Sequence, residues 1–187
     1  GVVEKTNQYI GLKGFNLEEH FRHLVPIPMT VGNDMDFLTM GCWAQKHPDA
    51  GSLVTLFMGG NGIGGGMVIN GRLWTGASGY CSEVGFLPVY ERLNKGSLGL
   101  PPAEHISELY ARLIQVYAVT VNPHMMVLYR HPLLEGRLDE IRRLCASYLP
   151  SKAIPSIELS YDYQQDYEKG LFTVAKSLEQ AVSEGGL

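Results

Sequence analysis

The stretch GGNGIGGGMVINGRLW, residues 59–74, decides how this sequence is interpreted. Residues 60–65 satisfy the dinucleotide-binding letters G-x-G-x-x-G, but that motif needs a helix to follow, with its N-terminus facing a pyrophosphate. Here Asn70-Gly71 follows instead, between two apolar runs, and this pair is the strongest short-range signal for a type I′ hairpin turn. A Walker-type phosphate loop also fails, because no Lys-Ser or Lys-Thr follows the glycines. We therefore expect neighbouring strands over 53–58 and 66–75, joined through the glycine run.

The glycine run itself allows two interpretations. Successive bare backbone N–H groups at a turn between strands form a possible site for an anion. Alternatively, glycine is needed because a neighbouring element packs too closely for any side chain. The residues alone weigh these two interpretations about equally.

Composition limits the class of protein. With 187 residues and 45% apolar residues, the chain can form one domain with a real core. The net charge of -4 leaves no surface-wide basic field for nucleic acid. The three cysteines, Cys42, Cys81 and Cys145, are far apart and contain no C-x-x-C pair, which is typical of a reducing cytosol. No signal peptide and no membrane-spanning stretch is recognisable, so we expect a cytoplasmic protein without a membrane partner.

Hydrophobic spacing predicts alternating strands and helices. Strands are expected over 27–34, 53–58, 124–130 and 154–160, and helices over 16–24, 34–47, 105–121, 132–149 and 166–182. The alternation in the last third of the chain indicates an α/β layer with parallel strand pairing.

Three polar residues are candidates for a shared site. Asn33 and Asp34 end a predicted strand, where α/β proteins commonly place ligand groups, and Glu83 lies among small residues just after the hairpin. Carboxylates accept hydrogen bonds from vicinal hydroxyls, and an Asp can also take a hydroxyl proton during phosphoryl transfer. These residues therefore indicate a polyhydroxyl ligand. The residues alone favour this role of Asp34 no more than the competing one, in which Asp34 is the N-cap of a helix.

The motifs resemble those of the ROK family (repressor, open reading frame, kinase). Its patterns E-N-D-A-N-A-A, G-T-G-I-G-G-G-x-x-x-N-G and G-x-x-G-x-A-G-E-x-G-H are matched most specifically over 59–89, in "GNGIGGGMVINGRLWTGASGYCSEVGFLPV". "NPHMMVLYR" is similar to the family's N-P-E-x-I-V-x-G-G. The resemblance implies an α/β, actin-like fold, that of sugar kinases, Hsp70 and actin, with a ribonuclease H-like mixed sheet and flanking helices. It places residues 1–187 in the C-terminal lobe, with the N-terminal lobe and any DNA-binding domain outside this chain.

The resemblance also implies roles for single residues. Asn33 would bind a sugar hydroxyl, and Asp34 would be the catalytic base of a kinase or a sugar contact of a repressor. Gly79 and Glu83 would contact the sugar as well. A phosphate loop would be formed by Gly60, Asn61, Gly62 and Gly64.

Several positions depart from the family pattern, and each departure falls on a functional feature. Gly32 replaces the Glu before Asn-Asp, Asn61 replaces the loop threonine, and Phe86 replaces a histidine that binds sugar and zinc in the family. "YERLNKGSLGL", residues 90–100, replaces the zinc motif, so we expect no zinc or other metal. Tyr129-Arg130 replaces the adenosine-side G-G and is expected to crowd a nucleotide.

Three functions remain open. The departures favour the sugar-sensing lobe of a transcriptional regulator similar to N-acetylglucosamine repressors, which contacts DNA only through a domain outside this chain. The alternatives are one lobe of an ATP-dependent, glucokinase-like hexose or N-acetylhexosamine kinase, and a dimerisation module without a ligand. The expected partners are a small sugar or sugar phosphate and a second copy of the chain. No cofactor is expected, except ATP with Mg²⁺ if the protein is a kinase.

Overall fold

The computed structural model describes residues 1–3, 10–25, 27–60, 62–93 and 101–184. Its centre is a five-stranded mixed sheet in the order β3-β2-β1-β4-β5. The strands are β1 (Ser52–Gly59), β2 (Gly62–Ile69), β3 (Arg72–Leu73), β4 (Met125–Tyr129) and β5 (Ser156–Ser160). β1, β2 and β3 pair antiparallel, whereas β1–β4 and β4–β5 pair parallel. The mixed sheet and the parallel pairing late in the chain confirm the predicted fold class.

The glycine-rich stretch forms two successive hairpins. β1 and β2 pair as far as Gly59 opposite Gly62, and β2 and β3 pair as far as Ile69 opposite Arg72. Asn70 and Gly71 form the second tip with φ values of 50° and 73°, as a type I′ turn requires. The second strand nevertheless begins at residue 62 rather than 66, so most of the glycines are part of the sheet.

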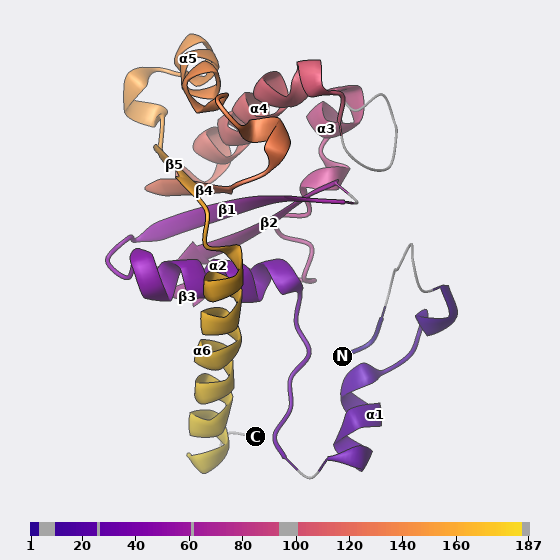
Figure 1. The fold of residues 1–187 in the computed structure, drawn as a ribbon. Coiled ribbons are helices and arrows are strands. Elements are labelled where there is room, and N and C mark those ends of the chain that lie inside the picture. The colour runs from indigo at the N-terminus through magenta and orange to yellow at the C-terminus, as the bar shows by residue number, and fades with distance from the viewer. Residues whose placement is uncertain (4–9, 26, 61, 94–100, 185–187) are drawn as a thin grey trace.

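Helices cover both faces of the sheet (Figure 1). α3 (Pro88–Leu93), α4 (Ile106–Thr120) and α5 (Leu138–Tyr148) lie on one face, and α2 (Asp34–Lys46) and α6 (Tyr163–Ser183) lie on the other. Both faces of the central strands are buried, which explains why "LVTLFM" and "MMVLY" are nearly continuous apolar runs. None of the helices that the structure describes combines the length and hydrophobicity needed to cross a lipid bilayer.

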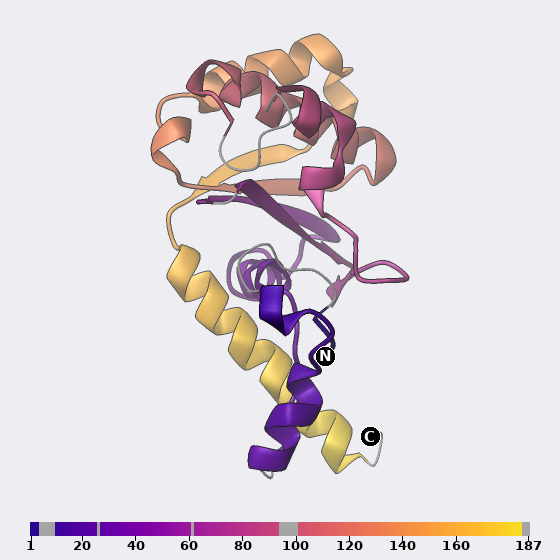
Figure 2. The same cartoon turned by 90° about the vertical axis from the view of Figure 1, so that its right-hand side faces the viewer.

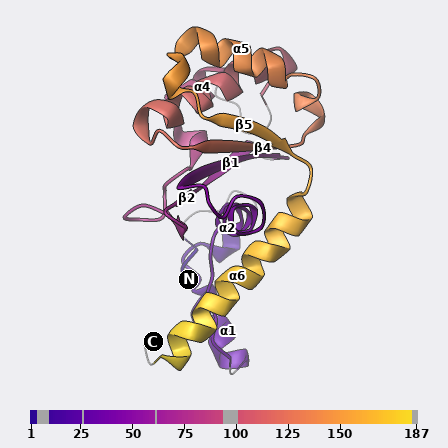
Figure 3. The same cartoon turned by 90° about the vertical axis from the view of Figure 1, so that its left-hand side faces the viewer.

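α2 and α6 cross at very close range through two glycines. A Cβ atom on Gly41 would lie 1.6 Å from the carbonyl oxygen of Asp166, and one on Gly170 would lie 1.7 Å from that of Phe37. No other residue fits either position, so this pair of glycines fixes how the two helices cross. Beyond the crossing, α6 extends far from the sheet on the side of α2 (Figures 2 and 3).

The predicted strand over 27–34 is wrong. Residues 27–33 form an irregular extended segment that connects α1 (Leu17–Leu24) to α2. Ile27 is 59% exposed and Val31 is 38% exposed, and Pro28 has no N–H to donate to a ladder. A strand needs a neighbour, and this segment pairs with no strand of the described sheet.

Candidate functional site

The first turn of α2 carries the candidate residues Asn33 and Asp34. Asn33 is the N-cap, since its side-chain oxygen accepts a hydrogen bond from the Met35 N–H at 2.8 Å. Asp34 is the first helical residue, and its Oδ1 accepts from the same N–H at 2.8 Å. The N-cap interpretation thus applies to Asn33 rather than to Asp34. Both residues are exposed, so this helix end can still receive a ligand.

Glu83 comes from a different element but belongs to the same cluster of carboxylates. It precedes the short 3-10 helix η2 (Val84–Phe86), after the second hairpin. The pKa of Asp36 is raised by burial and further by the nearby charges of Glu83 and Asp34. Asp34 and Glu83 are thus both near enough to Asp36 for their charges to affect its pKa, and their expected contact with one ligand stays a prediction. Asp36 was not among the sequence candidates, although its place two residues after Asp34 puts it in the same helical turn.

Close packing explains why most of these positions in β2 are glycine. A Cβ on Gly66 would lie 2.0 Å from Thr39 Oγ1, and one on Gly64 would lie 2.8 Å from Met35 Cγ, both in α2. Gly65 faces the opposite side, where a Cβ would lie 2.9 Å from the Ser82 carbonyl oxygen. The alternation follows the two-residue period of a strand, so the sheet needs glycine on both faces here.

The hairpin tip differs from the rest of the run. Gly60 is exposed, and a Cβ there would meet nothing within 4 Å. Gly62 has a φ of 131°, which strongly favours glycine. The open tip leaves Gly60 and Gly62 as candidates for a phosphate contact, whereas packing alone accounts for Gly64. Asn61 lies outside the described residues.

Gly79 lies in an exposed loop between the second hairpin and Glu83. Its φ of 77° accounts for glycine at this position, and a Cβ would meet nothing within 4 Å. Its expected contact with a sugar stays a prediction.

A pocket of about 390 Å³ lies directly beside Glu83. Its walls include Tyr80, Phe86, Val116 and Tyr117. Phe86, at the position where the family resemblance leads us to expect histidine, is 62% exposed, and its ring centroid lies 6.3 Å from that of Tyr80 in an edge-to-face arrangement. Sequence reasoning named Phe86 only as a departure and did not foresee the pocket.

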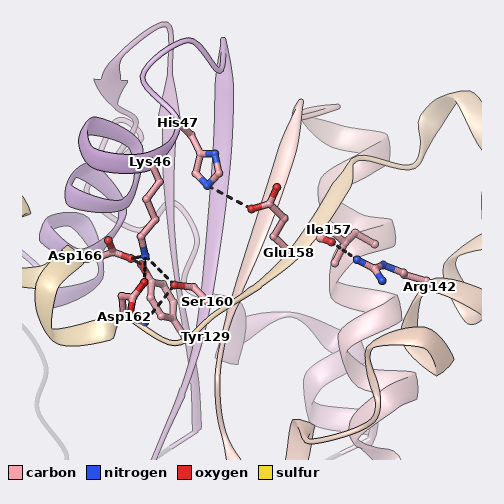
Figure 4. Close-up of polar contacts among 9 residues, drawn as sticks. All are labelled: Lys46, His47, Tyr129, Arg142, Ile157, Glu158, Ser160, Asp162 and Asp166. Carbon is pink, nitrogen blue, oxygen red and sulfur yellow. Dashed lines mark hydrogen bonds and ion pairs between the residues drawn. The ribbon is translucent and has the colours of Figure 1, made fainter.

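Tyr129 was expected to crowd a bound nucleotide, but its side chain is buried inside the protein. Tyr129 ends β4, is 1% exposed, and packs on the α2 side of the sheet. Its hydroxyl donates a hydrogen bond to Asp166 Oδ2 at 2.6 Å (Figure 4). Only Arg130 adds exposed bulk at this end of the strand, where its guanidinium pairs with Glu135 at 2.6 Å and lies 5.6 Å from the Tyr161 ring centroid.

A partly buried polar network joins α2, β5 and α6 at this end of the sheet (Figure 4). Lys46 Nζ lies 2.8 Å from Asp166 Oδ2, 3.0 Å from Ser160 Oγ and 3.1 Å from Asp162 Oδ2. Burial alone would lower the pKa of Lys46, but its hydrogen bonds to Asp166 and Asp162 raise it overall, so the ammonium stays charged. The network was not foreseen from the sequence.

Metal binding has no visible support in the described part of the chain. No group of three or more His, Cys, Asp or Glu side chains there could hold a metal ion. Most of residues 90–100, the stretch that replaces the family's zinc motif, lies outside the described residues. The absence of zinc therefore stays a prediction.

The ROK family model matches residues 1–107. The chain belongs to the ROK family. A curated glucokinase from Halalkalibacterium halodurans is 30% identical over 80 residues, which make up 43% of this chain and 24% of the glucokinase. The matched region is thus about a quarter of that relative's length.

Solved structures of ROK proteins share the fold of this ROK chain. The ROK hexokinase from Thermus thermophilus has a TM-score of 0.67 at 15% identity, covering 89% of this chain and 72% of that one. A ROK family protein from Streptococcus pneumoniae TIGR4, in complex with sucrose, has a TM-score of 0.69 at 16% identity, covering 96% of this chain and 76% of that one. The mixed sheet with its flanking helices is accordingly the actin-like fold of ROK sugar kinases.

Proposed function

We propose that this chain is the sugar-binding, C-terminal lobe of a ROK transcriptional regulator. The observation that carries the proposal is a group of carboxylates from two elements, Asp34 and Asp36 in the first turn of α2 and Glu83 before η2, in which burial and then the charges of Glu83 and Asp34 raise the pKa of Asp36. Like charges at close range repel one another, and hydroxyl donors relieve that repulsion. A neutral polyhydroxyl molecule is therefore the complementary ligand, and Asn33 adds an amide beside it.

The regulator is favoured over an enzyme by the residues at the other expected contacts. Phe86 offers no hydrogen bond at the position where the family resemblance places histidine. Arg130, at the position of an expected glycine, is held by Glu135 and Tyr161. The first substitution removes a hydrogen-bonding side chain, the second adds bulk where a kinase would hold its nucleotide, and both leave the carboxylates in place. Contact with DNA would be made by a domain outside this chain.

A sugar kinase is the second candidate, favoured by the 30% identity to a glucokinase. In that case Asp34 would accept the proton of the attacking sugar hydroxyl, and ATP with Mg²⁺ would supply the phosphoryl group. The hairpin tip suits a phosphate, because nothing lies within 4 Å of a Cβ on Gly60. Phosphoryl transfer depends on positioning from both sides of the phosphates, so we expect this chain by itself to show no turnover.

Calorimetry with free hexoses and N-acetylhexosamines tests the proposal. We expect one sugar to bind, Glu83→Gln and Asp34→Asn to weaken its binding at least tenfold, and Asp49→Asn, an exposed carboxylate outside the cluster, to leave it unchanged. A coupled assay with ATP on the protein that contains this chain separates the alternatives. Turnover that Asp34→Asn abolishes would establish the kinase instead. Binding of no sugar at all would leave only a dimerisation module.

A further inference from the structure

The pocket beside Glu83 has two chemically different parts. Glu83, Ser82 and Tyr117 contribute polar residues to its lining, and Tyr80, Phe86 and Val116 contribute apolar and aromatic surface. The volume, about 390 Å³, falls in the range of roughly 300–1,000 Å³ that small-molecule sites occupy. One pocket thus offers hydrogen bonds to one part of a ligand and an apolar wall to another.

The polar part borders the carboxylate cluster. Glu83 lines the pocket and is also a residue of the proposed sugar site, so the pocket and that site share this carboxylate. Burial raises the pKa of Tyr117 to about 12, so its phenol remains a neutral hydrogen-bonding group at any physiological pH. Tyr117 and the Ser82 backbone also lie against Gly65 of β2, which fixes this side of the pocket on the sheet.

The apolar part contains two well-exposed aromatic rings. Phe86 is 62% exposed and Tyr80 is 49% exposed, their rings meet edge to face, and both residues line the pocket. Large exposed aromatic groups that converge on a concave site commonly mark ligand contacts, because covering them releases water from apolar surface. At the Phe86 position the ligand therefore meets carbon and no hydrogen-bonding group.

We infer that the pocket binds an aromatic aglycone, so that the ligand of this protein is an aryl glycoside rather than a free sugar. The sugar ring would lie at Asp34 and Glu83, with the aglycone against Phe86, Tyr80 and Val116. This inference rests on the proposed function, because the aglycone is placed by the sugar to which it is attached. It adds the class of ligand, and it gives Phe86 the role of a specificity-determining residue.

The test compares matched glycosides by calorimetry. The probes are the phenyl and methyl glycosides of glucose and of N-acetylglucosamine, in both anomers, together with the two free sugars. We expect one phenyl glycoside to bind at least tenfold more tightly than its methyl counterpart. Phe86→Ala and Phe86→His should each remove most of that preference while the methyl glycoside binds as before. Phe172→Ala, which removes an aromatic ring that is 55% exposed on α6, should change neither affinity.

The outcomes separate this inference from the proposed function. Equal affinity for phenyl and methyl glycosides, or a phenyl preference that survives Phe86→Ala, overturns the aglycone pocket and leaves sugar binding intact. Binding of none of the glycosides and neither free sugar, in protein whose circular dichroism and thermal unfolding are normal, overturns both. Variants that fail to fold are recognised by the same two measurements, and Phe86→Leu then serves as the milder replacement.

Discussion

Nζ of Lys46 in α2 lies 2.8 Å from Oδ2 of Asp166 in α6, and the Asp166 side chain is fully buried. The same carboxylate oxygen accepts a hydrogen bond from Tyr129 at the end of β4. Burial raises the pKa of Tyr129, so it remains a neutral phenol that donates to the carboxylate. A charge this deep in the protein is tolerated because it is paired and hydrogen-bonded. The pair therefore ties both helices to the sheet.

Replacing Lys46 by Met should destabilise the protein by about 3 kcal/mol, because it leaves the Asp166 carboxylate buried without its cation. Urea unfolding followed by circular dichroism measures the change. Lys152→Met, which removes an exposed lysine in η5 (Ser151–Ala153), is the matched control and should shift the midpoint little. A loss below about 1 kcal/mol for Lys46→Met would mean that the pair contributes no more than an exposed ion pair.

Gly66→Ala should destabilise the protein by about 1–3 kcal/mol or more, because the added methyl group would overlap Thr39 Oγ1 at 2.0 Å and the Met35 carbonyl oxygen at 2.7 Å. Gly60→Ala, in the same glycine run, is the control, since nothing lies within 4 Å of its Cβ. Thermal unfolding of both variants makes the comparison. If they are equally stable, close packing against α2 does not explain the glycines of β2.

Asp36→Asn should stabilise the protein at pH 7. Burial, Glu83 and Asp34 raise the pKa of Asp36 in the folded state, so folding favours its protonated form. The resulting stability is present below the unfolded pKa and is lost as the pH rises through the folded pKa. The Asn side chain of Asp36→Asn does not ionise, so the variant avoids this loss of stability. Its higher stability relative to the original protein should therefore be seen at neutral pH and should disappear as the pH approaches about 4. Melting temperatures across that range test it, with Asp49→Asn as the control; a gain that does not depend on pH would refute the electrostatic cause.

Thiol labelling should distinguish the three cysteines. Burial raises the pKa of Cys42 to about 12 and that of Cys145 to about 11, and both side chains are fully buried. Cys81 is only half-buried. Because the thiolate is the reactive form, Ellman's reagent at pH 8 should modify one thiol quickly, and Cys81→Ser should abolish that phase. Fast reaction of more than one thiol in folded protein would contradict the buried positions of the other two.

The sequence predicts the parts of this fold that depend on local signals. Asn70-Gly71 specifies its hairpin within a few residues, and apolar spacing locates the central strands and most helices. Whether residues 27–33 form a strand depends instead on a pairing partner elsewhere in the protein. The direction of Tyr129 depends on which face of β4 the last residue occupies, and an error of one residue reverses it. A short motif therefore predicts where Tyr129 lies in the chain but not which face it occupies.

The candidate site likewise contains residues that the sequence predicts and residues that only the folded structure brings together. Asn33, Asp34 and Glu83 are recognisable because they lie in short motifs at element ends. The Lys46–Asp166 pair joins residues that are 120 positions apart, and no local pattern connects them. The pocket at Phe86 needs Val116 and Tyr117 of α4 as its opposite wall, so it exists only after the chain has folded.

We expect the protein to form a two-fold dimer through the hairpin side and the helices of the last third of the chain. β3 is the edge strand of the sheet, only two residues long, and Trp74 directly after it is 55% exposed. On α6, Leu171 and Phe172 are 41% and 55% exposed. Apolar surface of this kind is commonly covered in an assembly, and a closed two-fold pair is the commonest arrangement of identical chains.

Sedimentation at micromolar concentration tests the dimer. Trp74→Glu should shift the protein toward monomer, because a charge at the centre of an interface loses its hydration without gaining a partner. Leu24→Glu, at a 63% exposed position on α1 away from the hairpins, should leave the association unchanged. In a regulator, two paired chains would hold two DNA-binding domains at a fixed separation, and a sugar bound at Asp34 and Glu83 would act by changing it. A monomer throughout the micromolar range would remove the dimer and, with it, this route from sugar binding to DNA.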